Sequence, residues 1–99
     1  MKISISASAY EDLQGIKIYY QNEGVPQVGE NFVKAIIKHI ETLAENPMIG
    51  RMVPEFEEEE IRELIRPPFR VVYLYEKNRV HIIRVWRSER LLIIPESKV

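Results

Sequence analysis

The 99-residue sequence contains no cysteine. Disulfide bonds, thiolate metal ligands and cysteine nucleophiles are therefore excluded, and the composition fits a reducing compartment. No apolar run approaches the ~20 residues that a membrane-spanning helix needs. The first residues, Met1–Ser6, run directly into a strand pattern and lack the apolar core of a signal peptide. We therefore predict a cytoplasmic protein with no membrane partner.

Histidine and aspartate are scarce. His39 and His81 are the two histidines, and Asp12 is the single aspartate. No serine lies in a Gly-x-Ser-x-Gly elbow, so a Ser-His-Asp triad has little support, and a glycine-rich phosphate loop is also absent. The glutamates of residues 55–60 do not follow the alternating spacing of a calcium loop. We predict neither a metal site nor a cofactor.

The length and composition indicate one globular domain. The sequence is 45% hydrophobic and 29% charged, which is typical of an ordinary globular protein. A chain of this size can enclose one hydrophobic core but not a second. We predict a single domain over residues 1–99, with residues 91–99 as a C-terminal segment or tail.

The N-terminal part predicts a strand followed by a first helix. Apolar and polar residues alternate over residues 2–6, the period of a half-buried strand. Ser8 and Glu11 match a capping box, in which the serine begins a helix and the glutamate reaches back to it. Gly24 is suited to end this helix because glycine readily adopts the left-handed conformation.

A second helix follows almost at once. Pro26 suits its first turn, where the missing N–H is not needed, and Pro47 ends it because the residue before a proline avoids the helical conformation. Between them, apolar residues recur at spacings of three and four and form one stripe: Phe32, Ile36, Ile37, Ile40, Leu43 and Ala44. The two helices therefore form a hairpin.

The C-terminal part predicts three strands, at about residues 61–65, 70–76 and 79–86, after a loop at 48–60. Pro67-Pro68 and Lys77-Asn78 supply the turns, and the second is short enough for a two-residue hairpin. The element order is β-α-α-β-β-β. We predict an α+β fold with the helical hairpin packed on one face of a small, mostly antiparallel sheet.

The last strand has two alternating sets of side chains. We assign the more apolar set to the helices, namely His81, Ile83, Val85 and Arg87. The other set would then face away from the helices, because successive side chains of a strand point to opposite faces. This places Trp86 on the open face with Arg84 beside it.

Charge is segregated along the chain although the net charge is only −1. Residues 55–60 carry five negative charges, and residues 61–90 hold eight basic and three acidic side chains. Seven of those eight are arginines. The acidic loop is either a solvated segment beside a basic sheet or a screen that covers the arginines until a partner arrives, and the sequence leaves both readings open.

Arginines of this density suit a carboxylate or a phosphate partner. An arginine cannot serve as a general base, so metal-free RNA cleavage would also need a proton-transfer group. The candidates near the arginines are Tyr73, Tyr75, His81 and Glu89. Alternatively, several arginines are neutralised by the chain's own glutamates.

Several motifs together resemble the ParE/RelE superfamily of type II toxin–antitoxin toxins, also known as plasmid stabilisation proteins. The resemblance covers about residues 2–92. It is carried by the order and spacing of these segments: Asp12-Leu13, Tyr19-Tyr20, Asn46-Pro47, Gly50-Arg51-x-Val53-Pro54-Glu55, Arg62-Glu63-Leu64, Arg70-Val71-Val72-Tyr73 and Val85-Trp86-Arg87-Ser88-Glu89-Arg90. The fold that the resemblance implies has the same β-α-α-β-β-β order.

The two branches of the superfamily imply different activities. RelE-like members cut messenger RNA on the ribosome, and the resemblance would give Arg70, Arg87 and Arg90 catalytic roles. The lysines and the C-terminal tyrosine of that branch are missing here, since Ile61, Glu63 and Ile94 stand near their places. ParE-like members poison DNA gyrase by protein contact, and this chain resembles them in the loop that begins at Gly50.

We therefore predict a ParE-like growth inhibitor that acts on DNA gyrase and is paired with a cognate antitoxin. The residues predicted to bind target or antitoxin are Arg62, Arg70, Trp86, Arg87 and Arg90. Two alternatives stay open: a RelE-like, ribosome-dependent endoribonuclease, and a non-toxic module that only binds an antitoxin. A homodimer or a heterotetramer with the antitoxin also stays open.

Overall fold

The computed structural model describes residues 1–87 of the chain; the predicted C-terminal segment and Arg90 lie outside these residues. The α+β class and the β-α-α-β-β-β order are confirmed, with one short extra strand in the loop that precedes the predicted sheet. The elements are β1 (Lys2–Ile5), α1 (Ala7–Asn22), α2 (Pro26–Glu41), the short 3-10 helix η1 (Thr42–Ala44), β2 (Arg51–Met52), β3 (Ile61–Arg66), β4 (Phe69–Glu76) and β5 (Arg79–Arg87).

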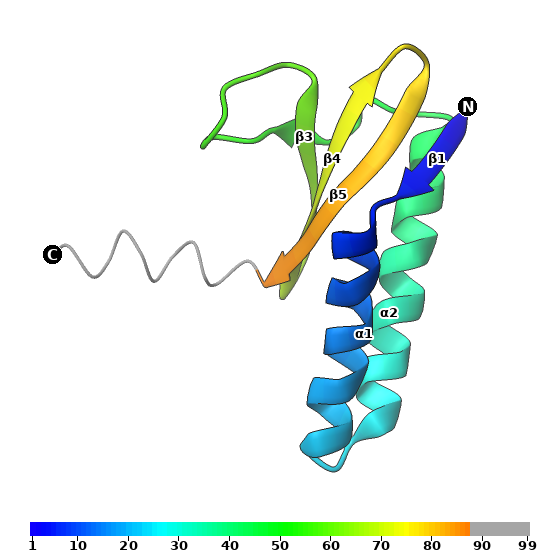
Figure 1. The fold of residues 1–99 in the computed structure, drawn as a ribbon, viewed down its shortest axis with the longest axis vertical. Coiled ribbons are helices and arrows are strands. Elements are labelled where there is room, and N and C mark those ends of the chain that lie inside the picture. Colours follow the sequence, from blue (N-terminus) through cyan, green and yellow to red (C-terminus); the bar gives the residue numbers. More distant parts are fainter. Residues whose placement is uncertain (88–99) are drawn as a thin grey trace, which may run out of the picture.

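The strands form one sheet in the order β1-β5-β4-β3-β2. β1 runs parallel to β5, and every other neighbouring pair is antiparallel. The α1–α2 hairpin covers one face of this sheet, while the loop between β2 and β3 lies on the side away from the helices (Figure 1). We call the face without helices the open face.

The start of α1 differs from the prediction. Ser6, not Ser8, is the N-cap, and its hydroxyl accepts a hydrogen bond from the Ala9 N–H at 3.0 Å. The same hydroxyl donates to the Ile83 carbonyl at 2.9 Å. Ser6 therefore ends the pairing with β5 and begins the helix at once, which leaves no turn in which Ser8 could cap. The predicted stop is confirmed, since the helix ends just before Gly24 at φ +80°.

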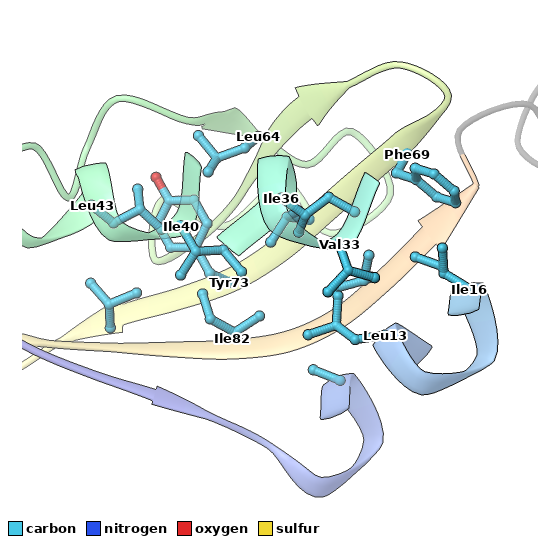
Figure 2. Packing of buried hydrophobic residues seen from close by; sticks show 14 residues of the cluster. Leu13, Ile16, Val33, Ile36, Ile40, Leu43, Leu64, Phe69, Tyr73 and Ile82 are labelled. Carbon is cyan, nitrogen blue, oxygen red and sulfur yellow. The ribbon is translucent and has the colours of Figure 1, made fainter. Parts of the chain in front are cut away.

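The core lies between the hairpin and the sheet (Figure 2). α2 begins at Pro26 as predicted, and its buried stripe faces the strands through residues such as Val33, Ile36 and Ile40. Leu64 on β3 and Tyr73 on β4 enclose the other side of this cluster. Neither helix in the described part of the chain is long and apolar enough to cross a membrane.

A β-bulge changes the direction of the side chains along β5. Val72 is paired with Arg84, but the next residue, Tyr73, is paired with Ile82, so Ile83 is an extra residue without a partner on β4. Before the bulge, Val80 and Ile82 are buried against the helices; after it, Val85 is buried.

The predicted facing of β5 is therefore only half right. Val85 faces the helices as expected, whereas His81 and Ile83 do not belong to the core. A strict period of two cannot anticipate an inserted residue. One extra residue places every later side chain on the face opposite to the one that the alternation in the sequence predicts. The two-residue turn is confirmed: Lys77 and Asn78 both have positive φ, as a tight hairpin requires.

Candidate functional site

The loop that follows η1 is fastened to β3 and β4 at Gly50. The Tyr73 hydroxyl accepts a hydrogen bond from the Gly50 N–H at 2.9 Å and donates to the Pro47 carbonyl at 2.8 Å. A Cβ atom at Gly50 would lie 2.6 Å from the Tyr73 oxygen and 2.7 Å from the Glu63 carbonyl oxygen. This close approach of the backbone requires glycine. Burial raises the pKa of the Tyr73 hydroxyl, which therefore stays protonated at neutral pH.

Four alternating charges continue this attachment along the loop. Arg51 Nε lies 2.6 Å from one carboxylate oxygen of Glu63, and Arg70 lies 2.5 Å from the other. Arg70 also reaches Glu55 in the loop at 3.2 Å. Arg70 and Glu63 are each 1% exposed, so their charges are buried as a neutralised set, which is the arrangement that buried ions require.

Backbone and apolar contacts complete the attachment. Arg62 donates to the carbonyls of Gly50 and Glu59 at 2.9 and 3.0 Å. Val53 and Val72 are fully buried but lie outside the main core cluster. Residues 50–55 thus form a clasp that covers part of the open face, and we call it the Gly50–Glu55 clasp.

Trp86 lies next to the clasp between two guanidinium groups. The central carbon of Arg70 is 5.7 Å from the centre of its ring, and that of Arg84 is 5.2 Å away. Both distances are within the range of a cation–π contact. The predicted position of Trp86 beside Arg84 is confirmed, and the pairing of Trp86 with Arg70 across β4 and β5 places both on the open face.

Asp12 organises the end of β5. Its carboxylate accepts hydrogen bonds from the Arg84 side chain at 2.8 and 3.0 Å and from the Val85 N–H at 2.8 Å. The hydrogen bonds to Asp12 raise the pKa of the Arg84 guanidinium. The carboxylate also satisfies a backbone donor on the part of β5 that extends past its pairing with β1.

Arg87 lies at the end of β5, over the helices. Its guanidinium group is within 3.4 Å of the Tyr20 hydroxyl, 5.9 Å from the Tyr19 ring centre and 5.4 Å from the Phe69 ring centre. A cavity of about 350 Å³ opens here between α1 and β5, lined by Asp12, Gly15, Tyr19, Trp86 and Arg87 among others. Such a hollow beside exposed aromatic and cationic groups suits a macromolecular partner.

Residues 3–92 match the family model described as the ParE toxin of the type II toxin–antitoxin system parDE. The chain belongs to this family. The predicted membership of the ParE/RelE superfamily, and with it the role of a type II toxin, is thereby confirmed. No curated protein matches the chain in sequence.

Solved structures show the same fold as this ParE-family chain. It is similar to a chain of the chromosomal ParDE toxin–antitoxin system from P. aeruginosa, with a TM-score of 0.74 and 24% identity over 90% of this chain and 97% of that one. It is also similar to a chain of the RelBE2 toxin–antitoxin complex from Mycobacterium tuberculosis (TM-score 0.64, 16% identity, 87% and 95% covered). A third is the YoeB dimer from Staphylococcus aureus (0.61, 22%, 87% and 94%).

The structure places the predicted binding residues of this ParE-family toxin in different surroundings. Arg70 is buried under Glu55, Arg62 is bonded to two carbonyls, and Trp86 and Arg87 lie beside the cavity. Arg90 lies outside the described residues. Their roles in binding stay predictions.

The carboxylates that organise the site were anticipated only in part. Asp12, Glu55 and Glu63 hold three of the arginines. Glu63 bears out the alternative that the chain's own glutamates neutralise arginines, whereas the pairing of Asp12 with Arg84 gave no sign in the sequence. The one available signal was the glutamate at the end of the Gly50–Glu55 motif, which is separated by 15 residues from its partner Arg70. Within residues 1–87, no three histidine, aspartate or glutamate side chains are grouped so that they could hold a metal ion.

Proposed function

We propose that this ParE-family toxin inhibits growth by binding DNA gyrase through protein–protein contact, and that a cognate antitoxin neutralises it. The toxin would then act in the cytoplasm as a single domain over residues 1–99, and its pairing with the antitoxin would support plasmid stabilisation. The family match supports the general role of a type II toxin. The choice of gyrase as the target rests on the chemical groups at the described surface.

One observation carries the choice of a protein target: Arg70 is buried and paired with two carboxylates. In the RelE-like alternative this arginine would have to clamp an RNA phosphate. A phosphate would first have to displace Glu55 and would then compete with Glu63, so the buried pair opposes that role. The arrangement instead uses Arg70 to hold the Gly50–Glu55 clasp against β4.

The groups that could transfer a proton also support a non-enzymatic role. The Tyr73 hydroxyl is committed to Pro47 and Gly50, and its pKa is raised by burial. His81 lies six residues before Arg87 along β5, or roughly 20 Å at the rise of an extended strand. Metal-free cleavage would need a proton-transfer group and a phosphate-binding arginine on one open surface. In the described part of the chain these groups are not gathered in this way.

Trp86 and Arg87 are the contact residues that we propose on the described surface, with Arg90 following in the sequence. Tryptophan and arginine dominate the binding energy of many protein interfaces because each combines a large contact area with directed polar groups. Here Trp86 is fixed by flanking guanidinium groups and Arg87 by Tyr20, so little side-chain freedom is lost on binding. Acidic side chains of gyrase or of the antitoxin would meet them.

The antitoxin would order as it binds, either as a helix or as an added strand. Two of the similar structures are described as a toxin–antitoxin system and a toxin–antitoxin complex, which supports a partner of this kind. The cavity between α1 and β5 is where we propose that its acidic segment binds.

Two assays with purified toxin test the target. In the first, gyrase relaxes or supercoils plasmid DNA with increasing toxin, and we expect inhibition that reaches completion near stoichiometric amounts. In the second, toxin is added to a translating extract, and messenger RNA is analysed for cuts positioned at codons. Such cuts together with unaffected gyrase would overturn the proposal in favour of the nuclease.

A third experiment concerns the non-toxic alternative. Expression of the chain alone in a bacterium should stop growth, whereas normal growth with abundant folded protein would support a module that only binds an antitoxin. A Lys34→Glu variant serves as the control, since Lys34 is exposed on α2 and distant in the sequence from the cavity-lining residues. It should inhibit gyrase as strongly as the unchanged toxin.

A further inference from the structure

Four polar side chains lie together where β1 meets β5. The parallel register pairs Lys2 with Arg79 and Ser4 with His81. The residues between them, Ile3 and Val80, belong to or pack against the core. Because side chains alternate along a strand, the four polar side chains point to the open face, at the opposite end of β5 from Arg87.

The surface is hollowed at this place. A depression of about 320 Å³ is lined by the four polar residues together with Ile3 and Val80. This volume is at the lower end of the range for small-molecule sites. The depression is therefore large enough for a small anionic group, and all four polar side chains line it.

The two cations of this group are not neutralised by the chain itself. Within residues 1–87, the side chains of Lys2 and Arg79 have neither a hydrogen bond nor an ion pair. Glu76 is paired with Arg79 across the turn but forms no ion pair with it. Like charges directly opposite each other on neighbouring strands destabilise a sheet. An anion bound between them would remove this repulsion.

The other two side chains add directed hydrogen-bonding groups. The Ser4 hydroxyl and Nδ1 of His81 are hydrogen-bonded at 2.8 Å. This bond fixes the imidazole ring and leaves Nε2 without a hydrogen bond to any described residue. A fixed ring with one uncommitted nitrogen, next to an ammonium and a guanidinium group, presents several donors to one set of oxygen atoms. Tetrahedral phosphate oxygens match such a set.

We propose that Lys2, Ser4, Arg79 and His81 form a phosphate-binding site on the open face of β1 and β5. The phosphate is either a phosphomonoester, such as the end of a nucleotide, or the phosphodiester backbone of a nucleic acid. The proposal does not rest on the gyrase target, because it concerns a different end of the sheet and is tested by binding alone.

The test uses the purified full-length chain, labelled with ¹⁵N, and follows its backbone amide signals. Inorganic phosphate is titrated at constant ionic strength, with chloride as the competing salt, since screening would otherwise change with concentration. We expect saturable shifts at the amides of residues 2–4 and 79–81. Absence of saturable shifts at these amides, with phosphate and with the oligonucleotides below, would overturn the proposal.

Two double variants separate this site from general charge attraction. Lys2→Gln with Arg79→Gln should weaken phosphate binding by about tenfold or more, because two charge-assisted contacts are lost. Lys34→Gln with Lys38→Gln removes the same charge from exposed positions on α2 and should leave binding unchanged. Equal weakening by both pairs would overturn the proposal. If the first pair unfolds the chain, Ser4→Ala carries the test, with an expected weakening of a few-fold.

A pair of short oligonucleotides identifies the source of the phosphate. One carries a 5′-phosphate and the other a 5′-hydroxyl, with the same sequence. Binding of only the phosphorylated form at residues 2–4 and 79–81 assigns the site to a phosphomonoester, whereas equal binding of both assigns it to the nucleic-acid backbone; either result supports the site.

Discussion

Arg70 and Glu63 form an ion pair at 2.5 Å, and each residue is only 1% exposed. The pair lies under the Gly50–Glu55 clasp and joins the loop to the sheet through Arg51 and Glu55 on either side. The pair therefore gives a structural reason for the charged residues Glu63, in the Arg-Glu-Leu segment, and Arg70, in the Arg-Val-Val-Tyr segment: each neutralises the other inside the packed protein.

The Glu63→Gln variant should lose about 3–5 kcal/mol of unfolding free energy, because the change leaves a buried cation without its closest carboxylate. Urea denaturation measures this loss. Glu55→Gln is the matched control: Glu55 contacts the same arginine, but its side chain is 42% exposed, and its loss should be below about 1 kcal/mol. Equal losses would show that the buried carboxylate has no special role.

A Gly50→Ala substitution should destabilise the protein by about 1–3 kcal/mol, because the added methyl group would overlap the Tyr73 hydroxyl and force the clasp outward. Gly15→Ala provides the opposite expectation. A Cβ atom at Gly15, within α1, meets nothing within 4 Å, so this change should stabilise the helix by about 0.5–1 kcal/mol. Thermal unfolding of both variants followed by circular dichroism compares them directly, and a neutral Gly50→Ala would refute the close approach.

Ile40→Ala should reduce the unfolding free energy by about 2–5 kcal/mol, since Ile40 is 2% exposed in the centre of the core. Ile37 on the same helix has the same side chain but is 37% exposed, so Ile37→Ala should lose far less. Denaturant titration of the two variants side by side tests how α2 is docked, and a similar loss in both would contradict the packing described.

Acid should destabilise the fold partly through His39. Burial, together with the charge of Arg66, lowers the pKa of His39 below its usual 6.5. The unfolded chain then binds this proton more readily than the folded one, so the stability contributed by neutral His39 is present above about pH 6.5 and is lost as the pH falls.

Unfolding free energies measured from about pH 8 to about pH 5 should therefore decline less steeply for His39→Gln than for the unchanged chain. Arg66→Gln should also reduce the slope, by a smaller amount, because burial is the larger cause of the shift. Identical slopes for the unchanged chain and His39→Gln would exclude this histidine as a source of acid sensitivity.

Reversal of charge at Arg87 and at Arg90, which follows it in the sequence, should abolish growth inhibition without unfolding the domain. We expect Arg87→Glu with Arg90→Glu to weaken inhibition of gyrase at least about tenfold, because acidic groups of the partner would then be repelled. Lys34→Glu with Lys38→Glu makes the same change in charge on α2. A double variant of Arg87 and Arg90 that keeps full toxicity would show that neither arginine is needed to bind the target.

Much of the fold could be predicted from the sequence because the signals were local. Pro26 and Gly24 mark helix ends through backbone conformation alone, and the Lys77-Asn78 turn has only one compact solution. Ser6 was missed as the N-cap because its role depends on hydrogen bonds to β5, more than 70 residues away in the chain. β2 has two residues, too few to show any period.

The site was less predictable because its partners are distant in the sequence. The density of arginines predicted a surface for a carboxylate or phosphate partner, with neutralisation by the chain's own glutamates as the alternative. The structure bears out that alternative for Arg51 and Arg70, but the sequence did not indicate which carboxylate meets which guanidinium group. Asp12 and Arg84 are 72 residues apart, and only the packing of α1 beside β5 brings them together. The clasp likewise depends on the hydrogen bonds of the Tyr73 hydroxyl. The alternation of the strand predicts only that Tyr73 is a core residue.

The unpaired residue at Ile83 gives one strand two surfaces. Before Ile83, the open face of β5 carries Arg79 and His81. After it, the open face carries Trp86 and Arg84, the arginine bound to Asp12. If Ile83 were paired as an ordinary residue of the ladder, strict alternation would exchange the two faces for every residue after it. The aromatic ring that we propose as an anchor would then be driven toward the helices, and Val85 would be left in water. The bulge at Ile83 thus decides whether this end of the strand has anything to offer a partner.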